Sequence, residues 1–376
     1  MMDALDFIPN EKGEYCFEDG VYFNLPEKIY HKDNALGSTS IKDLARNPYR
    51  WQYDRIRPRQ KMETEAMTWG SAWHCRVLEG KEAFDLRYAK PPKPDDVPGC
   101  LVTTEHVKEF LRMHGQKLTG TKGDMIARAK DLDECPPIYD EVLAKWREEH
   151  PDYVELTERQ VQEIEDAVTN MEADETLRNV MRAGSLIEGS AELSIFWTVG
   201  GVRKKARFDY SLAPTAGRPK ALVVDLKSFT TFRSGTDEEA AADKVYLECY
   251  DLQAAHYMDA YDAARELVAQ GKMFGTAPRQ GYLNEFLNAP GVDWVWVMLR
   301  RDSGMLPVTL SIDTEDQFFK KARDIVADTI DVYRTHVEMF GVDKLWRPAQ
   351  RLPRRLNWSV MPTYNRGVRY EQPNDR

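Results

Sequence analysis

Hydrophobic residues recur along this chain with two different periods. Between residues 158 and 175 they recur every three or four positions, which is typical of the buried face of a helix. From Ser190 the period changes to two, and the segments 191–199 and 202–212 are predicted strands joined by Gly200-Gly201, a tight hairpin turn. A third strand is predicted over 221–229.

The pattern downstream alternates between helix and strand. A long helix is predicted over 237–270, two strands over 292–300 and 305–312, and a closing helix over 314–337. From residue 158 the predicted order is therefore α-β-β-β-α-β-β-α. This order indicates an α/β fold, a mixed β-sheet flanked by helices.

The first 100 residues predict two short helices. One begins at Ser38 or Ser40 and stops at Asn47-Pro48, where a basic run follows. The other lies within residues 65–80 and places His74 beside apolar residues.

Two proline-rich stretches divide the chain. Four prolines between Pro91 and Pro98, and Pro136-Pro137 further on, flank a predicted helical hairpin. The predicted organisation is one large domain with an insertion. Its parts are 1–100, the first part of the domain; 101–135, the inserted hairpin; 136–345, the core; and 346–376, a basic tail.

Composition supports a large packed core. Hydrophobic residues make up 42% of 376 residues, with 9 Trp, 17 Tyr and 14 Phe, which argues against disorder. No segment approaches the roughly 18 apolar residues that span a bilayer, and the acidic start does not resemble a signal peptide, so we expect a cytoplasmic protein without membrane contact. The five cysteines form no C-x-x-C pair, and we expect neither disulfides nor a cysteine-ligated zinc or iron–sulfur cluster.

The net charge of −10, from 52 Lys and Arg against 62 Asp and Glu, argues against a protein that binds polyanions by bulk attraction. Basic residues nevertheless cluster at 50–61, 203–207 and 347–355. These clusters either line a path for a nucleic acid or are solvated faces. Trp51 and Tyr53 in the first cluster offer stacking surfaces.

The third predicted strand carries the sharpest chemical signal. The period of two places Asp225 and Lys227 on one face of an otherwise apolar strand, and Asp209 lies on the preceding strand. An isolated D-x-K is more often a surface ion pair. Two carboxylates beside a lysine, however, suit Mg²⁺, which binds one or two carboxylates, water and phosphate oxygens. This arrangement favours metal-assisted phosphodiester hydrolysis.

These residues belong to a longer ordered series that resembles the P-D-(D/E)-x-K nuclease superfamily, most closely the exonuclease VIII (RecE-type) recombination nucleases. The resemblance covers residues 37–78 and 157–259. Its motifs are Gly70 to Cys75 with His74, Glu192, Arg207-x-Asp209, Asp225-x-Lys227 and Gln253-x-x-x-Tyr257. The fold it implies is restriction-endonuclease-like.

The resemblance also implies roles for single residues. Asp209, Asp225, His74 and the main-chain carbonyl of Leu226 would bind Mg²⁺, with Mn²⁺ as an alternative. Lys227 would serve the attacking water, and Glu192 would assist at the metal or support its ligands. Gln253 and Tyr257 would contact DNA, brace the lysine or simply pack the helix. Arg207 would bind phosphate or pair with Glu192.

The inserted hairpin resembles a SAP module, a small helical DNA-binding motif. The resemblance rests on Val107 to Leu111 and on Leu118-Thr119-Gly120-Thr121-Lys122 before the second helix. It implies phosphate contacts from Lys117, Lys122 and Arg128. A spacer or an oligomer contact is the alternative interpretation.

Together the resemblances imply a Mg²⁺-dependent exonuclease of bacterial or phage origin. It would degrade linear double-stranded DNA from its ends in the 5′ to 3′ direction and leave 3′ single strands for an annealing recombinase (RecT-type). A homo-oligomeric ring is also implied. The alternatives are a relative of the iron–sulfur CRISPR- or helicase-associated nucleases, and a catalytically inactive DNA-binding or assembly protein.

Overall fold

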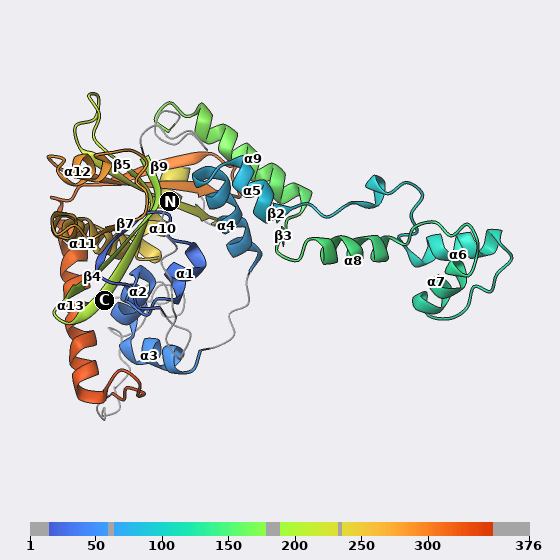
Figure 1. Ribbon diagram of the computed structural model, residues 1–376, viewed down its shortest axis with the longest axis horizontal. Coiled ribbons are helices and arrows are strands. Elements are labelled where there is room, and N and C mark those ends of the chain that lie inside the picture. The colour runs from blue at the N-terminus through green and yellow to red at the C-terminus, as the bar shows by residue number, and fades with distance from the viewer. Residues whose placement is uncertain (1–14, 59–63, 178–188, 232–234, 349–376) are drawn as a thin grey trace, which may run out of the picture.

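The computed structural model describes residues 15–58, 64–177, 189–231 and 235–348. Its centre is a mixed seven-stranded sheet in the order β7-β1-β4-β5-β6-β8-β9 (Figure 1). The strands are β1 (Gly20–Tyr22), β4 (Gly189–Val199), β5 (Val202–Leu212), β6 (Ala221–Phe229), β7 (Met273–Phe274), β8 (Val292–Arg300) and β9 (Pro307–Ile312). The mixed sheet and the predicted strands from residue 191 onward are confirmed. The long helix predicted over 237–270 is instead two helices, α10 (Asp237–Leu247) and α11 (Tyr250–Ala269), which are separated at Cys249, where φ is positive at 53°. The short elements β7 and α12 (Tyr282–Leu287) were not predicted.

The middle of the sheet is a β-meander followed by a crossover. Strands β4 and β5 form the predicted hairpin, and both glycines of the turn adopt positive φ, 56° at Gly200 and 77° at Gly201, as such a turn requires. Strand β6 pairs antiparallel to β5 and parallel to β8, with Asp225 opposite Trp296. The parallel step is made by the helices between β6 and β8.

Helices cover both faces of the sheet. On one face lie α2 (Ser38–Arg46), α10 (Asp237–Leu247), α11 (Tyr250–Ala269), α12 (Tyr282–Leu287) and α13 (Gln317–Phe340). On the other face lie α4 (Glu65–Leu78), α5 (Lys81–Arg87) and α9 (Glu158–Ala173). Successive residues of β6 point to opposite faces of the sheet. Val223 packs in the hydrophobic cluster under α2, α11 and α13, and Val224 packs in the cluster under α4 and α9.

The N-terminal region differs from the prediction at a helix boundary. Helix α2 begins at Ser38 with Gly37 as its N-cap, and a new helix, α3 (Pro48–Ile56), starts where a stop was predicted. The side chain of Asn47 accepts a hydrogen bond from the Arg50 N–H at 3.0 Å, and Pro48 occupies the first turn. Proline is well suited to a first turn, so Asn47-Pro48 ends one helix and starts the next. A short helix α1 (Glu27–Lys32) precedes both.

The side-chain alternation of the central hairpin is interrupted at one step. Ala206 and Phe208 of β5 join the cluster under α11, whereas Tyr210 and Leu212 join the cluster under α4 and α9. The change falls at Asp209. The residue across from it in β4 is Glu192, which adopts a positive φ of 53°. A left-handed glutamate is strained, and such strain is concentrated at functional sites.

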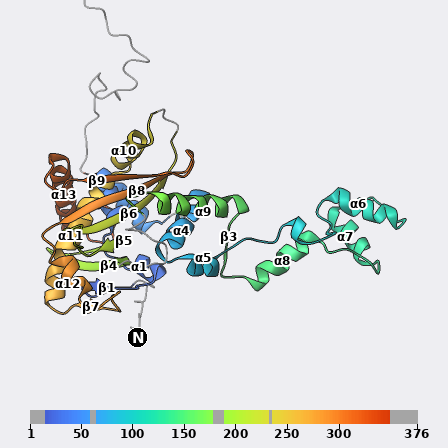
Figure 2. The same cartoon turned by 90° about the horizontal axis from the view of Figure 1, so that it is seen from above.

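The predicted insertion projects from the body of the molecule in both views (Figures 1 and 2). It contains α6 (Thr104–Met113), α7 (Lys122–Lys130) and α8 (Tyr139–Glu149), and it leaves and re-enters the body at the paired strands β2 (Tyr88–Ala89) and β3 (Val154–Glu155). Its own core includes Val107, Leu111 and Met125. The projection is therefore longer than residues 101–135, because α8 lies outside the body as well.

The other end of the body also extends further than predicted. Trp346 was assigned to the tail, but it is buried and packs against Trp51 and Tyr333 at ring distances of 5.6 and 5.9 Å. The basic segment 349–376 lies outside the described residues. Within the described ranges, no helix is long and apolar enough to cross a bilayer.

Candidate active site

The predicted acid and base of β6 form an ion pair at the floor of the candidate site. Lys227 Nζ lies 2.6 Å from Asp225 Oδ2, and only 1% of the Asp225 side chain is exposed, against 17% for Lys227. Both project from the face covered by α2 and α11. A charged pair this deep is costly unless further polar groups stabilise it, and these come from neighbouring elements.

Gln253 and Asp209 supply those groups. Gln253, on the first turn of α11, donates a hydrogen bond from Nε2 to Asp225 Oδ1 at 2.7 Å. Asp209 Oδ2 accepts a hydrogen bond from the Leu226 backbone N–H at 2.7 Å. Lys227 Nζ also donates to the Leu226 carbonyl at 3.3 Å. The backbone of Leu226 thus contacts both Asp209 and Lys227. The order of the strands predicted that Asp209 and Asp225 lie on neighbouring strands, which they do.

His74 approaches the same peptide from the other face of the sheet. It lies half-buried on α4, with its ring edge-on to the ring of Trp73 and the two ring centroids 5.5 Å apart. Burial lowers the pKa of His74, although Asp209 and a hydrogen bond with the Leu226 backbone oppose the shift. The imidazole is therefore neutral at physiological pH, which is the form that binds metal ions.

Glu192 and Arg207 form a second ion pair beside His74. Arg207 Nη2 donates to Glu192 Oε2, and its Nη1 donates to the Leu25 carbonyl at 2.8 Å. Burial raises the pKa of Glu192, although Arg207 opposes the shift. Glu192 and His74 share a cavity of about 250 Å³. The structure thus shows the pairing alternative for Arg207, since the guanidinium is buried and held by protein atoms.

Burial determines the direction of the pKa shift of Asp225, whereas the neighbouring carboxylates determine that of Lys227. Burial raises the pKa of Asp225 to about 7, against the attraction of Lys227 and with a further contribution from Asp209. Burial also lowers the pKa of Lys227, but Asp225 and Asp209 together outweigh it and hold that pKa above its ordinary value. Lys227 is consequently charged at neutral pH, whereas Asp225 titrates near neutrality.

Gln253 and Tyr257 are both buried in the structure. Gln253 braces Asp225 rather than facing solvent. Tyr257 packs against Phe208 and Trp294, with ring centroids 5.6 Å away in each case. In this conformation they support the strand pair, and neither presents a surface to DNA.

The cationic residues of the insertion are engaged to different degrees. Arg128 donates to the backbone carbonyls of Lys117 and Thr119 and so holds the turn before α7. Lys122 pairs with Asp140 on α8 at 2.6 Å. Lys117 is exposed. Contact of these residues with phosphate stays a prediction.

Of the three basic clusters, the middle one is internal. Arg203 pairs with Asp33 at 2.9 Å, and Lys205 Nζ donates to the Tyr30 and Asp33 carbonyls at 2.8 Å each. Lys204 is buried, 3.9 Å from Asp259. This cluster fixes the N-terminal region to β5 and does not line a nucleic-acid path. Trp51 is likewise packed inward, so only Tyr53 of the two predicted stacking surfaces is exposed.

The sequence interpretation missed two residues of the site, Lys42 of α2 and Tyr250 of α11. Lys42 of α2 and Lys227 contact the ring of Tyr250, at 5.0 and 5.3 Å from its centroid. Tyr250 precedes Gln253 by three positions on α11 and therefore lies on the same helical face, a spacing that was available as a signal. For Lys42 the sequence holds no comparable signal, because its position depends on how α2 packs on α11.

The donor set of the site suits a hard divalent cation. In the described part of the chain, no three His, Cys, Asp or Glu side chains form a ready-made cage. Mg²⁺ does not need one, since it binds one or two carboxylates and keeps several waters. Asp225 Oδ2 is buried without an aligned hydrogen bond, although Lys227 lies beside it. A buried oxygen in that state, next to Asp209 and the Leu226 carbonyl, fits a cation ligand.

Comparisons with known proteins found little. No family model and no curated protein matches the chain. Among solved structures, a candidate exonuclease from Eubacterium rectale is 12% identical over 78% of this chain and 97% of its own, with a TM-score of 0.30. The protein SSO0001 is 12% identical over 62% of this chain and 77% of its own, with a TM-score of 0.23. Because these TM-scores are low, the function is argued from the site residues alone.

Proposed function

We propose that this protein is a metal-dependent nuclease of the P-D-(D/E)-x-K type, with a restriction-endonuclease-like fold, that degrades linear double-stranded DNA from its ends. The observation that carries the proposal is the buried Asp225–Lys227 pair with Asp209 across the Leu226 peptide. A purely structural ion pair at this depth needs neither a second carboxylate on the adjacent strand β5 nor the strained Glu192 on β4, the strand beyond it.

Each residue has a part in this proposal. Asp209, Asp225, the Leu226 carbonyl and His74 would hold Mg²⁺, which when bound polarises the phosphodiester and activates water. Lys227, as a charged donor, orients the water and stabilises the negative charge that develops on the phosphate. Gln253 fixes the orientation of the Asp225 carboxylate.

The finer points of the proposal rest on the resemblance. It implies 5′ to 3′ polarity, 3′ single-stranded products for an annealing recombinase, and a homo-oligomeric ring. The insertion would add a sequence-independent contact with the duplex, since Lys117 and Lys122 lie on the projecting hairpin.

The proposal is tested with linear duplex DNA labelled separately at each end. With the wild-type protein we expect Mg²⁺-dependent release of label, none in EDTA, and no degradation of closed circular DNA of the same sequence. The end that loses label first gives the polarity. Wild-type protein that binds DNA but releases no label in Mg²⁺ or Mn²⁺ would instead favour the inactive DNA-binding alternative.

Removing the brace on Asp225 should weaken metal binding without abolishing the fold. We expect Gln253→Ala to lower the affinity for Mn²⁺ about 10- to 100-fold, the usual range for groups that orient a ligand. Isothermal titration calorimetry measures the affinity. Gln270→Ala, at the end of the same helix, is the control and should leave it unchanged. An affinity like that of the wild type would show that Gln253 is only a packing residue.

The projection should contribute to DNA binding and little to the stability of the body. Replacing residues 93–151 by a short Gly-Ser linker removes a region with its own core. We expect the main unfolding transition to stay within a few degrees, since only surface contacts of the body are lost. Duplex affinity should fall, and the slope of log K against log salt should decrease by about 0.9 for each phosphate contact removed. Titrations at several salt concentrations check this, and an unchanged slope would make the insertion a spacer.

A further inference from the structure

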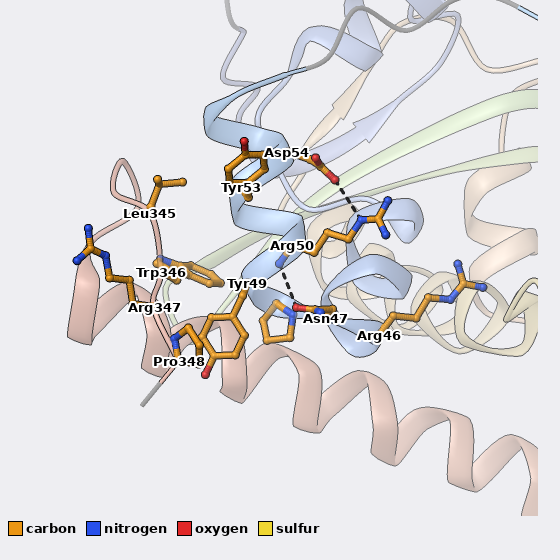
Figure 3. Close-up of a pocket in the computed structure, with 11 residues that line it drawn as sticks. Arg46, Asn47, Tyr49, Arg50, Tyr53, Asp54, Leu345, Trp346, Arg347 and Pro348 are labelled. Atoms are coloured by element: carbon orange, nitrogen blue, oxygen red, sulfur yellow. Dashed lines mark hydrogen bonds and ion pairs between the residues drawn. The ribbon is translucent and has the colours of Figure 1, made fainter. Parts of the chain in front are cut away.

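A second cavity among the described residues lies away from the candidate active site. It has a volume of about 910 Å³, and its walls are helix α3 and the segment 345–348 (Figure 3). The two walls are fixed to each other, because the fully buried Gln52 donates hydrogen bonds to the carbonyls of Val342 and Lys344 at 2.7 Å each. We name this cavity the α3 pocket.

The α3 pocket is basic in an otherwise acidic protein. Arg46, Arg50 and Arg347 line it, against the single carboxylate of Asp54, which lies 3.6 Å from Arg50. All three arginine side chains are exposed. For Arg347 the structure records no acidic partner among the described residues. The pocket thus carries an excess of positive charge in a protein whose net charge is −10.

Aromatic rings stand between these charges. Tyr49 and Tyr53 come from α3, and Tyr53 is 43% exposed. Trp346 forms part of the opposite wall, and its ring lies 5.6 Å from Trp51 behind it. Rings held in place beside arginines are the combination with which proteins bind unpaired nucleotides, by stacking on bases and pairing with phosphates.

Cationic residues of α2 and α3 lead from the candidate active site to the α3 pocket in a row. Lys227 and Lys42 both contact the ring of Tyr250, at 5.3 and 5.0 Å from its centroid. Arg46 lies one helical turn after Lys42 on α2 and donates to the Leu247 carbonyl at 3.1 Å, just before Tyr250. Arg50 follows on α3. The row therefore runs from Lys227 through Lys42 and Arg46 into the pocket.

We propose that the α3 pocket binds single-stranded DNA. The bound segment belongs to a strand that extends from the candidate active site along Lys42 and Arg46. This inference rests on the proposed function for its link to hydrolysis, but strand binding itself needs no catalysis. A single strand rather than a duplex is the ligand, because only unpaired bases can stack on Tyr53, which is exposed, and on the half-buried Tyr49 beside it. The phosphates would lie along Arg46, Arg50 and Arg347.

The test measures binding of a fluorescent 12-nucleotide single strand to the full-length protein in EDTA, by anisotropy at several salt concentrations. We expect the triple variant Arg46→Ala, Arg50→Ala, Arg347→Ala to bind at least about tenfold more weakly, with a salt slope lower by about two, since each single-strand phosphate contact contributes about 0.7. We expect Tyr53→Ala to bind about fivefold or more weakly through lost stacking.

The matched control removes the same charge elsewhere on the surface. Its substitutions are Arg159→Ala, Lys220→Ala and Lys320→Ala, all in exposed ion pairs. This variant should bind like the wild type. Equal weakening in both triple variants would overturn the proposal, because it would show bulk attraction only. Wild-type binding by the pocket variants, or equal competition by a blunt duplex, would overturn it too.

Cross-linking locates the strand directly. A single strand carrying 5-iodouracil should cross-link on irradiation to a peptide that contains Tyr49 or Tyr53, and mass spectrometry identifies it. Cross-links confined to the insertion would place the strand there and refute the α3 pocket. Both measurements are made without metal, so an absence of nuclease activity would contradict the proposed function and leave the strand-binding result intact.

Discussion

Replacing Asp225 by asparagine is expected to reduce Mg²⁺-dependent release of label from linear duplex DNA by at least about a thousandfold, as for other groups that act within one catalytic unit. The amide has the shape of the carboxylate and still offers an oxygen to Gln253. It lacks the negative charge that would hold the cation beside Asp209, and it leaves Lys227 without its closest anion. The loss should therefore appear in metal binding as well as in hydrolysis.

The measurement compares initial rates of the wild type, Asp225→Asn and a matched control. Asp293→Asn makes the same chemical change on the neighbouring strand β8, in an exposed pair with Lys220 at 2.8 Å, and should keep wild-type activity. Circular dichroism shows whether each variant is folded. A folded Asp225→Asn variant with more than about a tenth of the wild-type rate would contradict the proposed role.

The period of two in β6 carried most of the information about this site. An acid and a lysine two positions apart in an apolar strand predicted a buried pair on one face, and the structure shows it at 2.6 Å. The order of the strands also placed Asp209 on the strand next to Asp225, and the structure shows Asp209 bonded to the backbone N–H of Leu226. Both predictions follow from local geometry, because strand alternation and a meander leave few other arrangements.

The positive φ of Glu192 had no signal in the sequence. Glycine and asparagine mark left-handed positions, but glutamate does not, so alternation alone was expected to continue through Asp209. The switch of β5 side chains from one face of the sheet to the other at Asp209 is a tertiary effect. It places Tyr210 in the hydrophobic cluster under α4 and α9.

Charge runs were the least reliable guide. Arg203, Lys204 and Lys205 are consecutive and basic, yet they are engaged by Asp33, Asp259 and backbone carbonyls. Sequence proximity cannot show this, because the partners lie far away in the chain. The converse holds at the α3 pocket, where the first and third basic clusters, distant in sequence, supply Arg50 and Arg347 to one cavity.

Affinity for Mn²⁺ should rise steeply with pH and then level off near pH 7. Burial raises the pKa of Asp225 to about 7, with Lys227 opposing and Asp209 adding to the shift. Below that pH the carboxyl holds a proton that a bound cation must displace, and above it the site is already ionised. For a single proton the affinity should change about tenfold per pH unit, hence about a hundredfold between pH 5 and 7, and little between pH 7.5 and 8.5.

Calorimetry at half-unit pH steps measures this profile, and two variants identify its source. His74 also faces the site, but burial lowers its pKa, so its protonation would add to the slope only at the acidic end. His74→Ala should therefore keep the rise between pH 6 and 7, whereas Asp225→Asn should bind weakly and without a rise there. An affinity that is flat from pH 5 to 7 in the wild type would mean that Asp225 is ionised throughout. The buried pair would then be held by Lys227 alone, with no need of a cation.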